Sequence, residues 1–556
     1  MQSTTLSFAL LLALCGCAHA DGPAPVDGLT QVDANVPTAE QLDLTDADIA
    51  GLQARMASGK TSSLALTRAY LQRIATLDRA GPKLNSVIEL NPQAEADARA
   101  LDAERRAGRV RGQLHGIPVL LKDNIDAVPM VNSTGSLALA DFKPSRDAFL
   151  VQRLRTAGAV ILGKTNLSEW ANFRSTKSSS GWSARGGLTR NPYALDRNPC
   201  GSSAGTGAAI AASLATAGIG TETDGSITCP ASVNGLVGLK PTVGLISRDG
   251  IIPISASQDT AGPMTRSVTD AAALLQAIAA PDPQDPATRD APSSTPDYLA
   301  HLKPDGLRGA RLGLLRNPLR EDPAIAAALD RAVQSLRAAG ATVIETSLAT
   351  DGKWDAAEQT VLLVEFKAGL NAYLRSHAAP VSSLEQLIAF NRTHAQREMP
   401  YFAQELFEQA QAAPGLEDPA YLTARATAKR LAGPEGIDAA LKAHRLDALI
   451  VPTTGAAWVT DLVKGDTFPG AGYGAAAVAG YPSLSVPMGQ TQGLPLGLLF
   501  MGSAWSEPRL LELAYAYEQR SKARFAPSFA PSYAPSAPAA ASTAVPAPVP
   551  VPVPKP

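Results

Sequence analysis

The stretch CGSSAGTGAAIAASLATAGIGTETDGSITCPASVNGLVGLKPT, residues 200–242, contains two short loops rich in glycine and serine. An alanine-rich segment, residues 204–216, lies between the loops and predicts a helix, because alanine has the highest helix propensity. Glycine-rich loops let the backbone approach a ligand closely. The chemistry that we assign to this chain lies largely in these two loops.

Short apolar runs and helical patterns alternate on both sides of this stretch. The runs predict buried strands at 117–121, 159–162, 312–315, 448–451 and 496–500. Apolar periodicity predicts helices at 145–156, 204–216, 268–279, 324–339 and 507–520. Buried strands that alternate with helices are typical of an α/β fold. The sequence therefore predicts a mixed central β-sheet with helices on both faces.

The helical pattern begins near Asp46, and we expect one large domain over residues 46–524. Residues 21–45 are rich in Pro, Asp, Thr and Val and are interpreted as a linker. Within the domain, residues 281–444 contain Pro/Asp-rich loops and polar helices, which predict variable helical insertions that cover the sheet. Residues 525–556 are dominated by Pro, Ala, Ser and Val, a composition typical of a disordered, extended tail.

The first 20 residues predict a signal peptide. Residues 6–14 are apolar apart from Ser7 and are too few to span a bilayer, and Ala18-His19-Ala20 follows as a cleavage site. No Lys or Arg precedes this run, which departs from the usual pattern. The alternative is a lipoprotein box ending in a lipid anchor at Cys17. Either way we expect export to the periplasm or the medium, without a membrane span.

Charge and cysteine content limit the partners of the chain. A net charge of -2 over 556 residues gives no electrostatic reason to expect binding to nucleic acid. Cleavage after Ala20 would leave only Cys200 and Cys229, as buried free thiols or as a disulfide, and both alternatives stay open. No cysteine or histidine cluster has metal-ligand spacing, so we expect neither a metal nor another cofactor.

Four further motifs accompany residues 200–242: HGIPVLLKDNID (115–126), GAVILGKTNLSEW (158–170), SQDTAGPMTRSV (257–268) and GLPLGLLFMGSAWSEPRLLELAYAYE (493–518). Together they resemble the amidase signature family over about residues 46–524. GTETDGSI and GLISRDGIIPIS are similar to the bacterial peptide amidases within it. Carried over by motif position, the resemblance implies a catalytic triad of Lys122, Ser202 and Ser226, with a cis peptide before Ser202.

This assignment fits the chemistry of amide hydrolysis. A serine hydroxyl attacks a carbonyl only when a base removes its proton. A lysine is such a base only when neutral, so burial must lower the pKa of Lys122 below its reference of about 10.4. Its place at the end of the apolar run 117–121 fits that requirement. By resemblance, Ser202 carries the proton from Ser226 to Lys122, and Ser203 supports this network by hydrogen bonding.

The second loop has another role that the resemblance implies. Attack on the carbonyl places negative charge on oxygen, which preorganised donors stabilise. The backbone N–H groups of Thr223, Asp224, Gly225 and Ser226 would form this oxyanion hole. Many family members carry glycine at the position of Asp224, so its carboxylate either narrows the site or faces the substrate.

Two motifs match the sequence patterns of other functions, nucleotide binding and Ser-His-Asp hydrolysis. Residues 158–165 match the phosphate-binding pattern GxxxxGK[ST], but Ala-Val-Ile-Leu at the variable positions predicts a strand. Residues 201–205 match GxSxG, the nucleophile elbow of Ser-His-Asp hydrolases, yet residues 197–200 make a poor strand. His115 is interpreted as a residue that shapes its loop.

We therefore expect an amidase that acts on peptide or small-molecule amides, most specifically one that deamidates C-terminal peptide amides and releases ammonia. The alternative within the family is an amidase or esterase for aryl, aliphatic or fatty-acyl substrates. An ammonia-generating subunit for tRNA charging shares the implied fold, but the export signal argues against it. An exported binding protein without activity is disfavoured because all three catalytic positions are present.

Overall fold

The structure is a computed structural model that describes residues 42–292 and 294–532. These residues belong to one compact unit. The predicted signal peptide, the proposed anchor at Cys17, most of the linker (21–41) and residues 533–556 lie outside the described residues.

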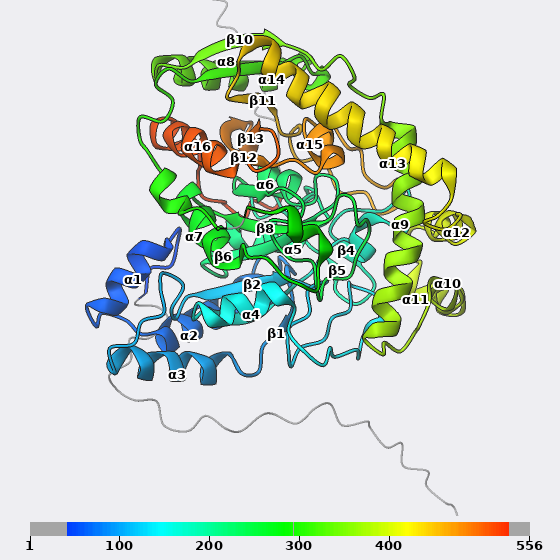
Figure 1. The fold of residues 1–556 in the computed structure, drawn as a ribbon. Helices are drawn as coiled ribbons and strands as arrows, with labels where there is room; N and C mark the ends of the chain where they lie inside the picture. Colours follow the sequence, from blue (N-terminus) through cyan, green and yellow to red (C-terminus); the bar gives the residue numbers. More distant parts are fainter. Residues whose placement is uncertain (1–41, 293, 533–556) are drawn as a thin grey trace, which may run out of the picture. The chain divides into compact units, whose positions relative to one another are not determined.

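A mixed sheet runs through the described chain (Figure 1). Its eleven strands, within the described residues, follow the spatial order β1 (Val87–Leu90), β3 (Val160–Thr165), β2 (Pro118–Lys122), β6 (Ala217–Glu222), β8 (Thr260–Thr265), β7 (Val237–Lys240), β12 (Ser483–Thr491), β13 (Leu494–Met501), β11 (Ala448–Pro452), β9 (Arg311–Leu315) and β10 (Thr342–Thr346). The pairs β3–β2, β2–β6, β11–β9 and β9–β10 are parallel, and the others are antiparallel. β4 (Trp182–Ser183) and β5 (Gly187–Leu188) form a separate hairpin.

Helices cover both faces of the sheet. On one face α5 (Ala204–Ala211) and α6 (Thr228–Val233) pack together against the central strands. On the other face α7 (Val268–Ile278), α8 (Pro323–Ala338) and α16 (Glu507–Ser521) pack on β7, β8, β12 and β13, and α4 (Phe149–Thr156) packs on α7.

The remaining helices flank this core. Before β3 come α1 (Ile49–Ala57), α2 (Ser63–Arg73) and α3 (Ala94–Arg106). After β10 follow α9 (Asp355–Ser376), α10 (Leu384–Thr393), α11 (Ala395–Glu398), α12 (Glu405–Ala412), α13 (Pro419–Ala432), α14 (Ala439–His444) and α15 (Gly474–Ala479). In Figure 1, α9 is the long yellow-green helix and α13 the long yellow helix.

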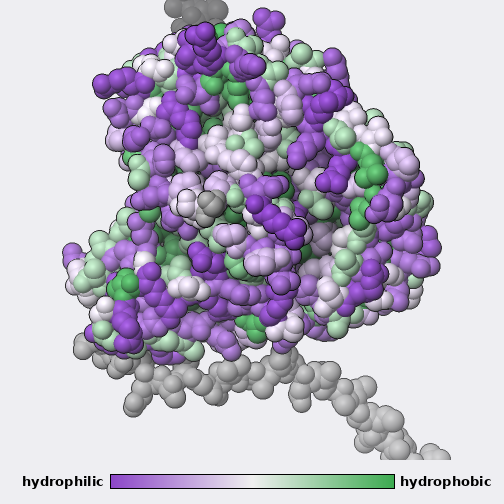
Figure 2. Space-filling view, viewed as in Figure 1, coloured by the Kyte–Doolittle hydropathy of each residue, from purple (hydrophilic) through white to green (hydrophobic). Residues whose placement is uncertain are grey.

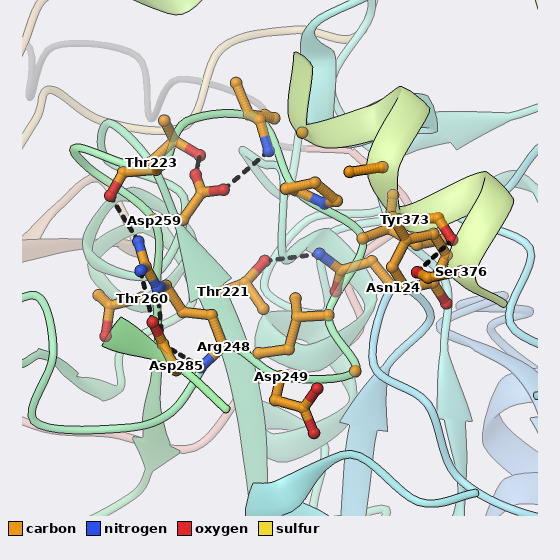
Figure 3. A pocket seen from close by; sticks show the side chains of 18 of the residues that line it. Asn124, Thr221, Thr223, Arg248, Asp249, Asp259, Thr260, Asp285, Tyr373 and Ser376 are labelled. Carbon is orange, nitrogen blue, oxygen red and sulfur yellow. Dashed lines mark hydrogen bonds and ion pairs between the residues drawn. The ribbon is translucent and has the colours of Figure 1, made fainter. Parts of the chain in front are cut away.

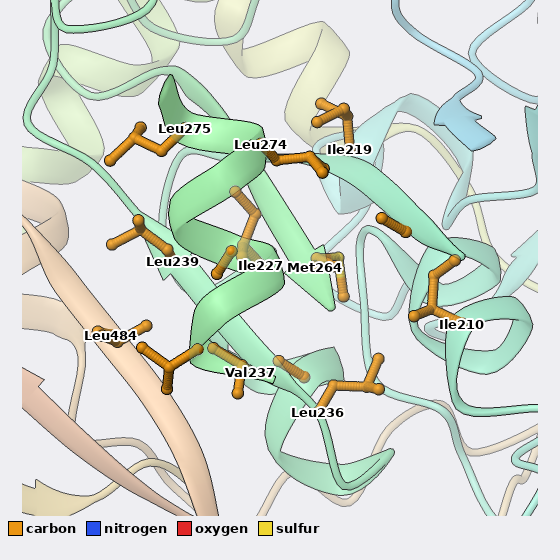
Figure 4. Close-up of a cluster of buried hydrophobic side chains, with 14 of the residues drawn as sticks. Ile210, Ile219, Ile227, Leu236, Val237, Leu239, Met264, Leu274, Leu275 and Leu484 are labelled. Atoms are coloured by element: carbon orange, nitrogen blue, oxygen red, sulfur yellow. The ribbon is translucent and has the colours of Figure 1, made fainter. Parts of the chain in front are cut away.

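Burial on both faces explains the continuous apolar runs of the strands. Along β13, Leu496, Leu498 and Phe500 join the larger core cluster with α7, α8 and α16. The alternate residues Leu499 and Met501 join the cluster on the other face, with Val451 and Val233. A strand whose two faces are buried carries apolar residues at successive positions. Figure 4 shows the larger cluster around β7, β8 and α7.

Two central strands, β6 and β7, contain glycine because helices approach them closely. A Cβ on Gly218 in β6 would lie 2.6 Å from Thr206 Cγ2 in α5. A Cβ on Gly238 in β7 would lie 2.5 Å from Ala231 Cβ in α6. Glycine is thus required at both positions for the helix–sheet distance. β6, β7 and β8 were not among the predicted strands, because they are rich in glycine, alanine and threonine and contain only Ile219 and Val237 as β-branched apolar residues.

Some predicted boundaries differ from the structure. The helix expected over 204–216 ends at Ala211, because the chain turns, with Ser213 at φ 55°, before entering β6. The region 281–444 is not wholly helical, since β9 and β10 lie within it and extend the sheet.

The predicted start of the tail at residue 525 is also corrected. Phe525 O accepts a hydrogen bond from the hydroxyl of Tyr193 at 2.5 Å, and the Leu195 N–H donates to Ala530 O at 2.8 Å. Residues 525–530 therefore pack on the domain.

The surface seen in Figure 2 is largely hydrophilic, with small separate apolar patches. Among the described residues, no helix combines the length and apolar character that crossing a membrane requires.

Candidate active site

Three chain segments converge at the centre of the sheet. Lys122 is the last residue of β2, Ser202 precedes α5, and Ser226 lies in the loop between β6 and α6. β2 and β6 are parallel neighbours, so Lys122 and the loop after β6 both lie at the carboxyl ends of these strands. The backbone N–H of Ser203 donates to Ser226 O at 3.2 Å, which joins the two serine loops. The Gly201–Ser202 peptide bond is cis, as predicted.

The Lys122 ammonium group lies in a compact, fully buried set of hydrogen bonds. Its Nζ donates to Ser202 Oγ at 2.7 Å, to Thr221 Oγ1 at 2.8 Å and to Thr221 O at 3.1 Å. Asn124 Nδ2 also donates to Thr221 Oγ1, at 3.0 Å. Lys122 Nζ is therefore held at a fixed position beside the Ser202 hydroxyl.

Burial lowers the pKa of Lys122 into the range in which a neutral lysine is present at physiological pH. Desolvation lowers its pKa from 10.5 to about 7, although the nearby carboxylates Asp259 and Glu222 act to raise it. At neutral pH about half of the Lys122 side chains are thus uncharged and able to accept a proton. This lowered pKa is what the proposed chemistry requires.

Two carboxylates shape the loop that carries Ser226. Glu222 Oε2 accepts hydrogen bonds from the N–H groups of Ile227 at 2.7 Å and Thr228 at 2.9 Å, which closes the loop before α6. Asp259 Oδ1 accepts from Thr223 Oγ1 at 2.6 Å.

Asp259 itself is fixed by the backbone. Its Oδ2 accepts from the N–H groups of Ile254 and Ser255, at 2.7 and 2.9 Å. Burial raises the pKa of Asp259 to about 6, so it is charged at neutral pH. The loop is preorganised by charge-assisted hydrogen bonds.

The four N–H groups predicted for the oxyanion hole, those of residues 223–226, donate no hydrogen bond to any described residue. They are consequently available to a substrate oxygen. Gly225 has φ +82°, and a Cβ there would collide with the ring of Tyr473. Glycine is required at this position both for the left-handed backbone and for the contact with Tyr473.

Two cavities meet this loop. The first, of about 250 Å³, is lined by residues that include Ser226, Asp224, Gly201, Phe173 and Tyr473. The second, of about 430 Å³, is shown in Figure 3: Thr221, Thr223 and Asp259 form one side, and Tyr373 and Ser376 of α9 form another. The second cavity is bordered by Ile251, Ile252 and Ile254 and so is largely apolar in its walls.

A disulfide connects the two serine loops. Cys200 and Cys229 are bonded, with their Cα atoms 6.0 Å apart. The sequence left a free thiol and a disulfide open, and the structure has the disulfide. It joins the residue two before Ser202 to the residue three after Ser226, so it restrains their relative position.

The family model described as Amidase matches residues 65–511. The chain belongs to the amidase family. A solved peptide amidase in complex with the competitive inhibitor chymostatin is 63% identical, with a TM-score of 0.86; the match covers 87% of this chain and 99% of that one. The native peptide amidase of Stenotrophomonas maltophilia is 62% identical with a TM-score of 0.85, over 87% and 99%. A probable amidase of Arabidopsis thaliana is 40% identical over 497 residues, which are 87% of this chain and 92% of the relative.

The predicted family and fold are therefore confirmed. In this amidase the structure brings Lys122 and Ser202 into hydrogen-bonding contact and places Ser226 on the adjoining loop. No hydrogen bond joins Ser202 Oγ to Ser226 Oγ within the described chain, so that step of the relay stays a prediction. Ser203 Oγ donates to Thr221 O at 3.1 Å and accepts from the Thr221 N–H at 3.2 Å, and its supporting role stays a prediction.

Sequence reasoning missed several residues of this amidase site. Thr221 and Glu222 lie in the quoted GTETDGS motif, but nothing in the motif shows that one binds Lys122 and the other binds the loop. Asn124, Asp259 and Tyr473 come from three other segments. Their proximity depends on the order of strands in the sheet, which spacing along the chain does not reveal.

The competing motifs have structural roles in the amidase. Gly163 and Lys164 of the phosphate-binding pattern lie inside β3, where Lys164 is buried 3.3 Å from Asp123. His115 is buried, and its Nε2 lies 3.0 Å from Leu101 O. Within residues 42–292 and 294–532, no three His, Cys, Asp or Glu side chains are grouped closely enough to hold a metal ion.

Proposed function

We propose that this amidase hydrolyses C-terminal peptide amides through an acyl-enzyme on Ser226. The observation that carries the proposal is the buried Lys122 Nζ, 2.7 Å from Ser202 Oγ and with a pKa near 7, beside a serine loop with free N–H groups. The 63% identity to a peptide amidase supports the choice of substrate.

In this mechanism Ser226 Oγ attacks the amide carbonyl carbon, and its proton passes through Ser202 to neutral Lys122. The N–H groups of residues 223–226 bind the oxygen that becomes negative. The C–N bond then breaks, Lys122 returns a proton through Ser202 to the nitrogen, and ammonia leaves. Water adds to the Ser226 ester, its proton follows the same route, and a carboxylic acid is released.

The cavity of about 250 Å³ at Ser226 supports a substrate bound by its terminal residues. Phe173 and Tyr473 provide apolar walls on which a side chain can pack. A second candidate, an amidase for fatty-acyl or aryl amides, is favoured by the larger cavity of about 430 Å³ with its isoleucine walls. Such a cavity has room for a long apolar acyl group.

The deciding experiment measures ammonia release from a panel of peptide amides, small aryl and aliphatic amides, and fatty amides. Ser226→Ala, which keeps the fold but removes the nucleophile, is the control for each substrate. We expect turnover of peptide amides that Ser226→Ala abolishes. Turnover of only fatty or aryl amides would move the assignment to the second candidate, and activity that persists in Ser226→Ala would contradict the mechanism.

We also propose that the chain is exported. The Cys200–Cys229 disulfide supports this, since disulfides persist in oxidising compartments. Expression of the full chain with a C-terminal epitope, followed by fractionation and mass measurement, tests both processing and location. Retention of the full-length chain in the cytoplasm would contradict export.

A further inference from the structure

A third cavity, of about 400 Å³, adjoins the Ser226 cavity and has an acidic lining. The two cavities share Asp224, Phe468 and Tyr473 as lining residues, so Asp224 lies at the boundary between them. Asp224 also immediately precedes Gly225 and Ser226 in the nucleophile loop. The third cavity therefore lies directly beside the cavity at Ser226.

Three further carboxylates line this cavity, all from the beginning of α9 and the turn before it: Asp351, Asp355 and Glu358. Arg316 is the single cation of its lining, and its side chain is 76% exposed and lies 3.7 Å from Glu345. Asp224 and Asp355 form no hydrogen bond or ion pair through their side chains with any described residue. The cavity thus contains more negative charge than the protein itself neutralises.

The side chain of Tyr473 offers an unpartnered hydroxyl at the boundary of the two cavities, independently of the carboxylates. Tyr473 is only 7% exposed, its ring packs against Gly225, and it lines both cavities. Its hydroxyl has no hydrogen-bond partner among the described residues. The oxygen reaches the open space of the cavities and is not enclosed by protein atoms, so its hydrogen-bonding capacity is free for a ligand or solvent. A polar group of a substrate that enters between the cavities would satisfy it.

The electrostatics of the cavity agree with a cationic ligand. Enclosure, and then the charge of Glu358, raise the pKa of Asp224, and burial raises the pKa of Glu358. Carboxylates that are held close together favour a cation among them. Trp354 and Phe468 add aromatic rings to the lining, and such rings attract ammonium and guanidinium groups. A bare metal ion does not fit, because no metal-holding group of side chains is present in the described chain.

We propose that this acidic cavity binds an ammonium or guanidinium group of the substrate, so that the enzyme prefers peptide amides with a positive charge near the scissile bond. The inference rests on the proposed function and names the class of peptide amide. The charge comes either from the free N-terminus of a dipeptide amide or from a basic side chain. Asp224 lies nearest to the reacting carbonyl, and Asp351 and Asp355 attract the cation from the far side.

Matched substrates separate the charge from every other property. Glycyl-leucine amide and N-acetyl-leucine amide differ only in the ammonium group of the first. N-acetyl-glycyl-arginine amide and its citrulline analogue differ in the charge of one side chain of equal shape. We expect kcat/KM of wild type to be about tenfold higher for at least one cationic member, a factor in the range of a few ion pairs. Which pair shows the preference identifies the source of the cation.

The double variant Asp351→Asn/Asp355→Asn tests the cavity. Both residues lie away from Lys122, Ser202 and Ser226, so hydrolysis of the neutral substrates should not change. The ratio of kcat/KM for the cationic substrate to kcat/KM for its neutral partner should fall about threefold to tenfold. Each partly exposed ion pair contributes a factor of about 1.5 to 5 to this ratio. The control is the double variant Asp305→Asn/Asp330→Asn, which removes the same charge. Both residues are exposed and line none of the cavities described above, so this variant should keep the preference for cationic substrates.

The outcomes are distinguishable from failure of the proposed function. If no peptide amide is hydrolysed, the proposed function itself fails. If neutral peptide amides turn over and neither cationic substrate is preferred, only the inference is overturned. An equal loss of preference in both double variants would assign the effect to the overall charge and would also overturn it.

Discussion

The pH dependence of kcat/KM gives the most direct test of Lys122 as the base. Its pKa is lowered from 10.5 to about 7 by complete burial, a change worth about 5 kcal/mol at 1.36 kcal/mol per unit. At pH 7 about one half of the lysine is neutral, against roughly 3 in 10,000 for an unperturbed side chain. The low pKa thus increases the active fraction about a thousandfold.

The direction of the pH profile follows from the protonation state that Lys122 needs to act as a base. Lys122 acts as a base only when deprotonated, so kcat/KM should rise as pH increases, with its midpoint near 7, and then level off. Initial rates of ammonia release between about pH 5 and 9, at substrate concentrations below KM, measure this limb. A midpoint above 9, or a profile that falls through pH 7, would refute the reasoning.

Asp259→Asn moves the same limb in a predictable direction. The Asp259 carboxylate stabilises the charged lysine and is the larger of the two influences that raise the pKa of Lys122. Its removal should therefore lower that pKa and shift the limb to lower pH, by some tenths of a unit to about one unit. The variant also loses the charge-assisted bond to Thr223 Oγ1, so kcat should fall. The decisive measurement is therefore the pH at which kcat/KM reaches half of its maximum, because the loss of the bond to Thr223 does not change this pH.

Three other perturbations have defined outcomes. Ser226→Ala should lower kcat by at least about 10⁴-fold while leaving the thermal unfolding midpoint nearly unchanged; turnover within tenfold of wild type would contradict its role as nucleophile. Gly225→Ala should abolish activity, because its Cβ would meet the Tyr473 ring and its φ is +82°; a crystal structure of an active variant with an undisturbed loop would show this reasoning to be wrong. Cys200→Ala/Cys229→Ala should lower the free energy of unfolding by about 3–4 kcal/mol. This is the chain-entropy value for a disulfide between residues 29 positions apart. Equal denaturation midpoints for the variant and the wild type, with and without reductant, would contradict the prediction.

Strands could be predicted from the sequence where a local run of apolar side chains determines them. The runs at 448–451 and 496–500 became β11 and β13 because strands buried on both faces need apolar residues at every position. β6 and β7 were not predicted, also for a physical reason. The close packing of α5 and α6 requires Gly218 and Gly238, and that composition removes the signal by which strands are recognised.

The candidate site divides in a similar way. The motifs predict Lys122, Ser202, Ser226 and an oxyanion hole at residues 223–226, since these residues lie in contiguous, recognisable segments. Tyr473 and Glu358 could not be found, because they reach Asp224 only through the folding of α9 and of the segment before α15. The disulfide was undecided because spacing alone does not show that Cys200 and Cys229 converge.

The carboxylates of the site present an apparent conflict, and the structure shows how it is resolved. Glu222 and Asp259 fix the loop of residues 223–226, yet each stabilises the charged form of Lys122, which cannot act as the proposed base. Each of them accepts hydrogen bonds from two backbone N–H groups and from a threonine hydroxyl, and this disperses much of its charge. Desolvation of Lys122 is the larger influence, and its pKa still falls to about 7. Carboxylates can therefore organise the loop while a lysine serves as base, provided that the lysine is fully buried and the carboxylates are bonded to the loop. A substitution that admits water to Lys122 should consequently impair catalysis more than one that removes either negative charge.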